Sequence, residues 1–347
     1  MIGAMFSEYL VENIKTDENI APKEKSNSTV PSEWPIQCIE KYTKNCQKNV
    51  DNPRLHTLSN YVSSNKNSWH NKVILGENSG LYVCLPPKSG VTNWHWLIAG
   101  ISKRLAPDMV GNFVHNVYDT WPNFMEYRRY LIEKLEKIVG TRARNLESEK
   151  IEDMRKWEDQ AVGVILVRHP LTRLYSSWSN RFYKTHAKHY PRKIKFIIEN
   201  FENAEDSPPE GMTVTFVSFL KFITSTEMWA DTQLQNGHWM PISILCDVCN
   251  LKYNYIINQE DATRQTKLFL KENGLEEFGP LGGHQTSDMN RSGQTISQDY
   301  SVLDRFRKIQ EKYKHDVPRE LVLKVYDKFK LDFEIFDYEL DGFLGEN

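Results

Sequence analysis

The stretch VGVILVRHPLTRLYSSWSNRF, residues 162–182, decides the fold class. Its first six residues form a continuous apolar run, which is typical of a strand buried on both faces of a sheet. Pro170 stands where a helix can begin, because the first helical position needs no backbone N–H. The stretch therefore predicts a buried strand, a short polar loop that starts at Arg168, and a helix.

A second unit of the same kind lies earlier in the chain. Residues 73–85, VILGENSGLYVCL, are predicted to form two short strands around a Gly/Asn turn, and residues 92–105 carry apolar side chains at helical spacing. Further helices are predicted at 39–45, 124–144, 216–223 and 319–336. Two strand–loop–helix units predict an α/β protein with a central, mostly parallel sheet flanked by helices. Its ligand is then expected at the carboxyl ends of the strands.

The composition is that of a globular protein without a large excess of charge. The 347 residues are 39% hydrophobic and carry a formal net charge of −2, which argues against a protein that coats nucleic acid. No segment has the apolar length of a membrane span, and the first residues lack the features of a signal peptide. This indicates an intracellular chain or one whose targeting segment is missing. Residues 1–35 are predicted to be a flexible stem or tail, and residues 36–347 a single domain.

The loop after the first unit's strand is a candidate anion site. Lys88 follows the strand directly, and residues 89–93 can turn their backbone N–H groups toward an anion at the start of the next helix. The Thr92 hydroxyl is a further donor. A Walker A loop is excluded because Tyr82 and Pro87 stand where it needs glycine. The alternative reading of Lys88 is a solvated lysine at the end of a strand.

The loop that starts at Arg168 is a second candidate anion site. An arginine fork and the hydroxyl of Ser176, in the following helix, are groups that bind phosphate. Arg173 and Asn180 share a helical face with Ser176, because residues three and four apart lie on one side of a helix. The alternative is a structural arginine and a structural serine. Two such loops predict a ligand with two separate anionic groups.

The chain has five cysteines: Cys38, Cys46, Cys84, Cys246 and Cys249. Four can pair, and Cys84 is expected to be the free thiol because it lies in a strand-like segment. Residues 246–249 have the spacing of a redox or zinc motif, but the chain has no second C-x-x-C or histidine pair that would complete a metal site. Pairing within the motif, pairing with Cys38 or Cys46, and free thiols are all compatible with the sequence.

Four segments, in this order along the chain, resemble the Golgi carbohydrate sulfotransferases, a family that includes chondroitin 4-O-sulfotransferases and the glucuronyl 3-O-sulfotransferase of the natural-killer epitope. PPKSGVTNW (86–94) is similar to the family's 5′-phosphosulfate loop, and LVRHPLTRLYSSWSNRF (166–182) to its 3′-phosphate loop. HWMPISILCDVCNLKYNYIINQED (238–261) and LVLKVYDKFKLDFEIFDY (321–338) are similar to two later family segments. Four motifs in order are far more specific than one.

The resemblance implies a P-loop-like sulfotransferase fold and transfer of a sulfuryl group from 3′-phosphoadenosine 5′-phosphosulfate to a hydroxyl of a glycosaminoglycan or of a glucuronyl or N-acetylgalactosamine glycan. No metal is required. It implies that Lys88 acts on the bridging and sulfate oxygens, and that Arg168 and Ser176 bind the 3′-phosphate. The loop residues implied in donor binding are Lys88, Ser89, Gly90, Val91, Thr92 and Asn93.

The general base and the acceptor site have weaker signals. His115 follows the first helix at about the distance where the family carries a histidine, and it is the predicted base, with His238 next. The alternative is a histidine that only forms a hydrogen bond in a loop. Cations after the second loop are predicted to bind an acidic glycan: Lys184, Lys188, Arg192, Lys193 and Lys195. Their alternative is a solvated basic surface.

The resemblance also implies a place in the cell. A Golgi-lumen glycoprotein is predicted, with Cys246 and Cys249 oxidised and sequons at Asn27 and Asn290. Its membrane anchor would lie outside this chain, and a cytoplasmic enzyme is the alternative. No nucleic-acid partner is expected. The competing functions are a nucleotide-dependent kinase and a catalytically silent glycan-binding relative.

Overall fold

The structure, a computed structural model, describes residues 36–49, 72–75, 81–91, 93–94, 97–98, 162–249, 251–276 and 298–345. These residues all belong to one compact unit, which begins at Glu33. The tail predicted at 1–35 and the helix predicted at 124–144 lie outside the described residues.

The sheet has four strands in the order β1-β2-β3-β4. The strands are β1 (Lys72–Leu75), β2 (Leu81–Cys84), β3 (Val162–Val167) and β4 (Tyr255–Asn258). β1 and β2 form the predicted antiparallel pair, and β3 lies parallel to both β2 and β4. The prediction of an α/β protein with a mostly parallel sheet is therefore confirmed.

Strand β3 is buried on both faces, as its continuous apolar sequence predicts. Ile165 and Val167 belong to a large hydrophobic cluster, whereas Val164 and Leu166 belong to a second cluster on the other face. All four side chains have no exposed surface. Since side chains alternate along a strand, every residue of β3 faces a layer of apolar groups.

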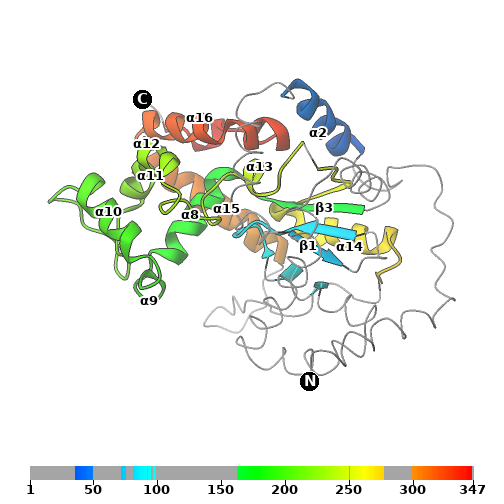
Figure 1. The fold of residues 1–347 in the computed structure, drawn as a ribbon, viewed down its shortest axis with the longest axis horizontal. Helices are drawn as coiled ribbons and strands as arrows, with labels where there is room; N and C mark the ends of the chain where they lie inside the picture. Colours follow the sequence, from blue (N-terminus) through cyan, green and yellow to red (C-terminus); the bar gives the residue numbers. More distant parts are fainter. Residues whose placement is uncertain are drawn as a thin grey trace, which may run out of the picture. The chain divides into compact units, whose positions relative to one another are not determined.

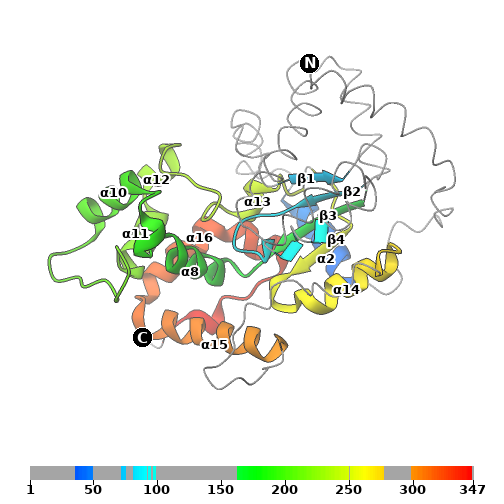
Figure 2. The ribbon, with the colours of Figure 1, turned by 90° about the horizontal axis from the view of Figure 1, so that it is seen from below.

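The helices supply these two layers. They are α2 (Ile36–Lys48), α8 (Pro170–Arg181), α9 (Lys184–Ala187), α10 (Pro191–Phe201), α11 (Phe216–Thr224), α12 (Thr226–Ala230), α13 (Ile242–Leu245), α14 (Ala262–Glu272), α15 (Gln298–Asp316) and α16 (Arg319–Phe336), with short 3-10 turns at Gln259–Asp261 and Asp341–Phe343. The large cluster draws on α8, α11 and α16, and the second cluster on α14. Figures 1 and 2 show α10, α11 and α12 together, away from the strands, whereas α14 lies beside the sheet.

The start of α8 is built from its own sequence. Pro170 occupies the first turn, and the side chain of His169 caps the helix by accepting a hydrogen bond from the backbone N–H of Leu171. A proline at this place removes only an N–H that would have no partner in the helix. The helices predicted at 216–223 and 319–336 are confirmed as α11 and α16. None of the helices in the described ranges is long and apolar enough to cross a bilayer.

Candidate functional site

The three parallel strands end at the same edge of the sheet. Cys84 at the end of β2 pairs with Ile165, and Val167 at the end of β3 pairs with Asn258 at the end of β4. The chain after β2 leads to Lys88, the chain after β3 starts with Arg168, and the chain after β4 starts with Gln259. Such an edge is where ligands bind in open α/β sheets.

The Lys88 loop is a tight turn with two left-handed residues. Lys88 has φ of 74° and Gly90 has φ of 82°. Glycine suits the second position because other residues rarely adopt this φ, and a Cβ there would also displace the Gln259 side chain, whose Oε1 would lie 2.1 Å away. The N–H of Ser89 donates to Pro86 O (3.3 Å), and the N–H of Asn93 donates to Gly90 O (3.2 Å). Two of the backbone groups expected to face an anion therefore hold the turn itself.

The amino group of Lys88 points at α8. Its Nζ donates to Oδ1 of Asn180 over 3.1 Å. Burial, and after it the positive charges of Arg181, Arg168 and Arg173, lower the pKa of Lys88 to about 8. Three guanidinium groups thus lie within electrostatic range of the Lys88 amino group, and a bound anion would offset this repulsion.

The Arg168 guanidinium forms two hydrogen bonds within the protein. Its Nε donates to the Thr172 hydroxyl (3.0 Å), and its Nη1 donates to the carbonyl oxygen of Lys88 (3.0 Å). A phosphate would therefore meet the two terminal nitrogens. Burial lowers the pKa of Arg168, while the carboxylate of Glu260 acts in the opposite direction.

A cavity of about 50 Å³ opens beside Arg168. It is lined by Arg168, Thr172, Gln259, Glu260, Val302, Arg305 and Phe306. Arg305, on α15, is not among the predicted site residues, because nothing in its local sequence distinguishes it from other helical arginines. Gln259 and Glu260 were predicted only as part of a family segment; the apolar run before them, YIIN, is the strand signal that marks them as strand-end residues.

Ser176 and Asn180 lie on the face of α8 that meets the Lys88 loop. Asn180 contacts Lys88, and Ser176 lies one turn earlier and is half-buried. Arg173 faces the same loop, since its Nε donates to Pro87 O over 2.9 Å. The helix face predicted from spacing is thus the one that faces the first loop.

Three buried polar atoms near this loop have no hydrogen-bond partner in the part of the chain that the structure describes. They are the Ser89 hydroxyl, Nε of Arg181 and the acceptor Oε1 of Gln259. Ser89 is only 2% exposed, so its hydroxyl has little access to bulk solvent. Buried donors without a partner are costly, and an anionic oxygen would satisfy the two donors. The residues present therefore fit an anionic donor.

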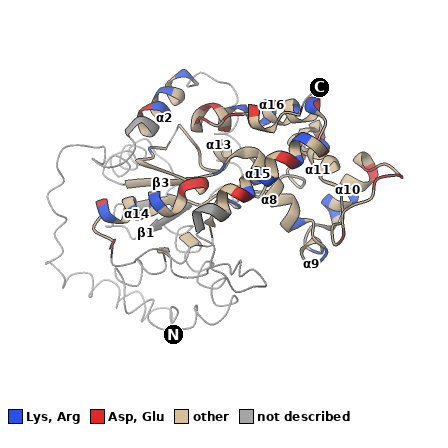
Figure 3. Ribbon diagram, turned by 180° about the vertical axis from the view of Figure 1, so that it is seen from behind, with Lys and Arg blue, Asp and Glu red and all other residues tan. Residues whose placement is uncertain are grey.

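The segment predicted to bind an acidic glycan is only partly free. Figure 3 shows basic residues on α9 and α10. Lys184 and Lys188 are exposed. Arg192 pairs with Asp231 (3.2 Å), and Lys195 pairs with Glu199 (3.6 Å).

Lys193 differs from its basic neighbours because it reaches inward. Its Nζ donates to Gln233 O over 2.6 Å and lies 6.0 Å from the ring centre of the buried Trp239. The chain beside Trp239 contacts α8, where the Ser177 hydroxyl donates to His238 O. Lys193 therefore contacts the segment, residues 233–239, that also contacts α8.

The histidines considered as general bases lie in different surroundings. His115 and also Thr92 of the first loop lie outside the described residues. His238 contacts Asn236, with its Nδ1 2.6 Å from Oδ1. His169 is buried, and its Nε2 donates to Glu339 O (2.9 Å).

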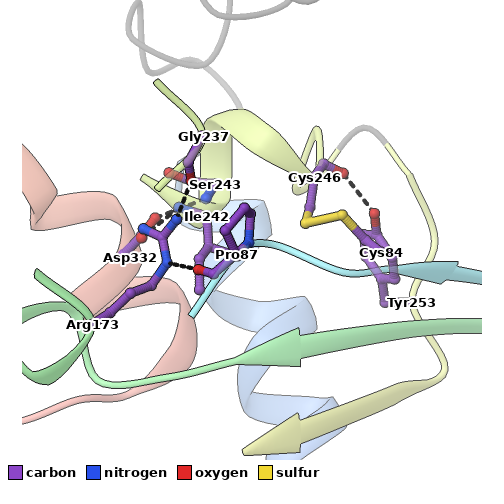
Figure 4. Close-up of a disulfide and its surroundings, with 9 residues drawn as sticks. All are labelled: Cys84, Pro87, Arg173, Gly237, Ile242, Ser243, Cys246, Tyr253 and Asp332. Carbon is purple, nitrogen blue, oxygen red and sulfur yellow. Dashed lines mark hydrogen bonds between the residues drawn. A yellow bond between two sulfur atoms is a disulfide. The ribbon is translucent and has the colours of Figure 1, made fainter. Parts of the chain in front are cut away.

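Two disulfides correct the expectation for Cys84. Cys84 pairs with Cys246, and Cys46 pairs with Cys249. Cys84 is therefore not the free thiol, because its side chain at the end of β2 points at the turn after α13 rather than into an isolated part of the core (Figure 4). The predicted oxidation of Cys246 and Cys249 is confirmed. Both cysteines are in separate bridges, so neither is a zinc ligand, and no three His, Cys, Asp or Glu side chains form a metal cluster within the described ranges.

Comparison with known proteins identifies the family. A model of the sulfotransferase family matches residues 71–339, and the chain belongs to this family. It is similar to carbohydrate sulfotransferase 14 of Danio rerio, with 27% identity over 179 residues, 51% of this chain and 43% of the relative. Carbohydrate sulfotransferase 12 of Mus musculus is 23% identical over 291 residues, 77% of this chain and 60% of the relative. Carbohydrate sulfotransferase 11 of Rattus norvegicus is 21% identical over 275 residues, which are 78% of this chain and 68% of the relative.

The chain spans 43% to 68% of the length of these three relatives. No solved structure matches it. The match confirms the family resemblance of the four sequence segments, and it extends across β1 to α16.

Proposed function

We propose that the protein transfers a sulfuryl group from 3′-phosphoadenosine 5′-phosphosulfate to a hydroxyl of a carbohydrate, on a P-loop-like sulfotransferase fold. The observation that carries the proposal is the cluster of Lys88, Arg168, Arg173 and Arg181 at the carboxyl edge of the parallel sheet. The names of the relatives, all carbohydrate sulfotransferases, support the same reaction.

In the proposed reaction, the acceptor hydroxyl oxygen forms a bond to sulfur while the bond from sulfur to the bridging oxygen of the 5′-phosphate breaks. Negative charge moves onto the leaving phosphate. The Lys88 cation stabilises that charge, because a fixed positive group in a partly buried site interacts more strongly than one in water. The hydroxyl proton goes to a general base, for which His115 is the candidate.

Binding of the donor is divided between the two loops. Ser89, Gly90, Val91, Thr92 and Asn93 would surround the 5′-phosphosulfate. Arg168 and Ser176 would bind the 3′-phosphate. The cavity beside Arg168 supports the role of Arg168, because a second guanidinium group, that of Arg305, also lines it; Ser176 does not line this cavity.

The acceptor is proposed to be an acidic glycan, either a glycosaminoglycan or a chain that ends in glucuronyl or N-acetylgalactosamine units. This assignment is supported by four basic side chains: the exposed Lys184 and Lys188, the inward-facing Lys193, and Arg192, which forms an ion pair with Asp231. Electrostatic attraction by such a surface would be strongest at low salt.

The two disulfides support a protein of an oxidising compartment. A Golgi-lumen enzyme is proposed on that basis. A reducing cytoplasm would leave these four cysteines as thiols, so the cytoplasmic alternative predicts a different redox state.

The direct test is incubation with sulfur-labelled donor and a panel of desulfated chondroitin, dermatan, heparan and small glucuronides. Label in a carbohydrate product is the expected result, and the sulfated position names the acceptor specificity. Transfer of labelled phosphate from ATP to the same panel would instead establish the kinase. Donor and glycan binding without any product would establish the silent glycan-binding relative.

A further inference from the structure

Arg173 is one of the largest fully buried side chains, although it carries a charge. It lies in the first turns of α8 and is 1% exposed. Its three guanidinium nitrogens donate to three backbone carbonyls: Nε to Pro87 (2.9 Å), Nη1 to Met240 (2.7 Å) and Nη2 to Gly237 (2.7 Å). Such a set uses every nitrogen of the group, which offsets much of the cost of burying it.

These carbonyls belong to two chain segments that α8 brings together. Pro87 immediately precedes Lys88, whereas Gly237 and Met240 lie in the segment between α12 and α13. Figure 4 shows the guanidinium between the two segments, with dashed lines to Pro87 and Gly237. The contact therefore fixes the Lys88 turn against a second backbone segment.

The same segment is held from its other side by α16. Asp332, 2% exposed, accepts hydrogen bonds from the N–H groups of Ile242 (2.7 Å) and Ser243 (2.8 Å). The negative charge of Asp332 stabilises the Arg173 cation, although the two groups share no direct hydrogen bond. Arg173 therefore holds the Lys88 turn against a backbone segment that Asp332 also binds.

The Lys88 turn needs this support because its conformation is unfavourable. A non-glycine residue in the left-handed region is strained and persists where its surroundings determine it. Arg173 donates a hydrogen bond to the carbonyl of Pro87, and Arg168 donates one to the carbonyl of Lys88. The two hydrogen bonds lie on either side of the left-handed φ and fix the direction in which the Lys88 side chain leaves the backbone.

We propose that Arg173 is a positioning residue for sulfuryl transfer, which holds the backbone of the Lys88 turn through the Pro87 carbonyl and so places the Lys88 amino group against the reacting oxygen. It does not touch the donor. The inference rests on the proposed function, and it adds to that function a specific role for Arg173.

The test variant is Arg173→Lys, which keeps the positive charge but cannot serve three carbonyls. Turnover at saturating donor should fall by about tenfold to a hundredfold, because a displacement near 1 Å is enough for such a loss. The affinity for 3′-phosphoadenosine 5′-phosphate, measured by calorimetry, should stay close to that of the unmodified chain because Arg168 and Ser176 are intact.

The matched control is Ser177→Ala. Ser177 is equally buried on the same helix, and its hydroxyl donates to the carbonyls of Arg173 and His238 but not to that of Pro87. Thermal unfolding corrects both variants for their folded fraction. If Ser177→Ala loses as much turnover as Arg173→Lys, the role of Arg173 is only structural and the proposal is overturned.

A readout without sulfate transfer separates this inference from the proposed function. The rate at which an amine-specific reagent modifies Lys88, followed by peptide mass spectrometry at about pH 10, reports its exposure with the amine neutral. Arg173→Lys should raise that rate several-fold, and Ser177→Ala should leave it unchanged. If the unmodified chain transfers no sulfate, the proposed function fails while this comparison still holds. An unchanged rate overturns the positioning role. Should Arg173→Lys fail to fold, Arg173→Gln, which carries no buried charge, gives the same comparison.

Discussion

Nη1 of Arg168 donates a hydrogen bond to the carbonyl oxygen of Lys88 over 3.0 Å, although 80 positions separate the two residues in the chain. The loops after β2 and β3 are therefore joined directly rather than forming two independent anion sites. This hydrogen bond holds the two parts of the candidate donor site next to each other.

Replacement of Lys88 tests its catalytic role. Lys88→Ala should lower turnover by roughly two to three decades and change donor affinity far less, because its charge is needed most when the leaving phosphate forms. Asn180→Ala is the matched control: it removes the acceptor for the Lys88 amino group but leaves the cation in place, so its loss of turnover should be much smaller. Steady-state kinetics with labelled donor measure both. Near-normal turnover of Lys88→Ala would exclude Lys88 from catalysis.

The pH profile should show the neighbouring arginines. Burial and the charges of Arg181, Arg168 and Arg173 lower the pKa of Lys88 to about 8. Lys88 must be protonated to stabilise the leaving phosphate, so kcat/KM should fall as pH rises through about 8. The anionic donor favours the protonated form, and the corresponding limb of kcat should lie at higher pH. Identical limbs in kcat and kcat/KM would contradict this assignment.

Arg168 and Arg305 are predicted to bind the same phosphate. Arg168→Ala and Arg305→Ala should each weaken binding of 3′-phosphoadenosine 5′-phosphate by about tenfold or more, which corresponds to one hydrogen bond to a charged group. Arg307→Ala is the control, because Arg307 is an exposed arginine of the same helix that does not line the cavity. Calorimetry measures all three. If Arg305→Ala binds as Arg307→Ala does, Arg305 lies outside the donor site.

The sequence predicted the parts of this site that depend on local order. The apolar run of β3, the proline at the start of α8 and the spacing of Ser176 and Asn180 are all local signals, and the structure has each of them where it was expected. The pairing of Cys84 with Cys246 and the place of Arg305 in the cavity depend on contacts between residues more than a hundred positions apart. A single sequence does not specify such contacts.

The disulfide pattern predicts a defined count of thiols. Protein made in an oxidising compartment and alkylated while denatured, without reductant, should carry one label out of five cysteines, on Cys38, because the other four are in bridges. Changing Cys84 and Cys246 together to serine should lower the free energy of unfolding by about 2–5 kcal/mol, since the bridge closes a long loop. Peptide mass spectrometry and urea unfolding check the two statements. Labels on Cys84 in the unreduced protein would contradict the pairing.

His169 should make the fold sensitive to acid. Its Nε2 donates to Glu339 O, so Nδ1 is the unprotonated nitrogen that caps α8 by accepting from the Leu171 N–H (3.3 Å). Protonation would destroy this cap, and burial lowers the pKa of His169 from 6.5 to about 4. Because the folded pKa lies below the unfolded value, the stabilising contribution is fully present above about pH 6.5 and is lost as pH falls toward 4. The free energy of unfolding should drop by about 2 kcal/mol between pH 7 and pH 5 from this group.

The control variant is His169→Asn, which keeps a capping acceptor but does not titrate, so its unfolding free energy should change less over the same interval. Urea unfolding of both proteins at the two pH values gives the comparison, and equal losses would show that the acid sensitivity comes from other groups.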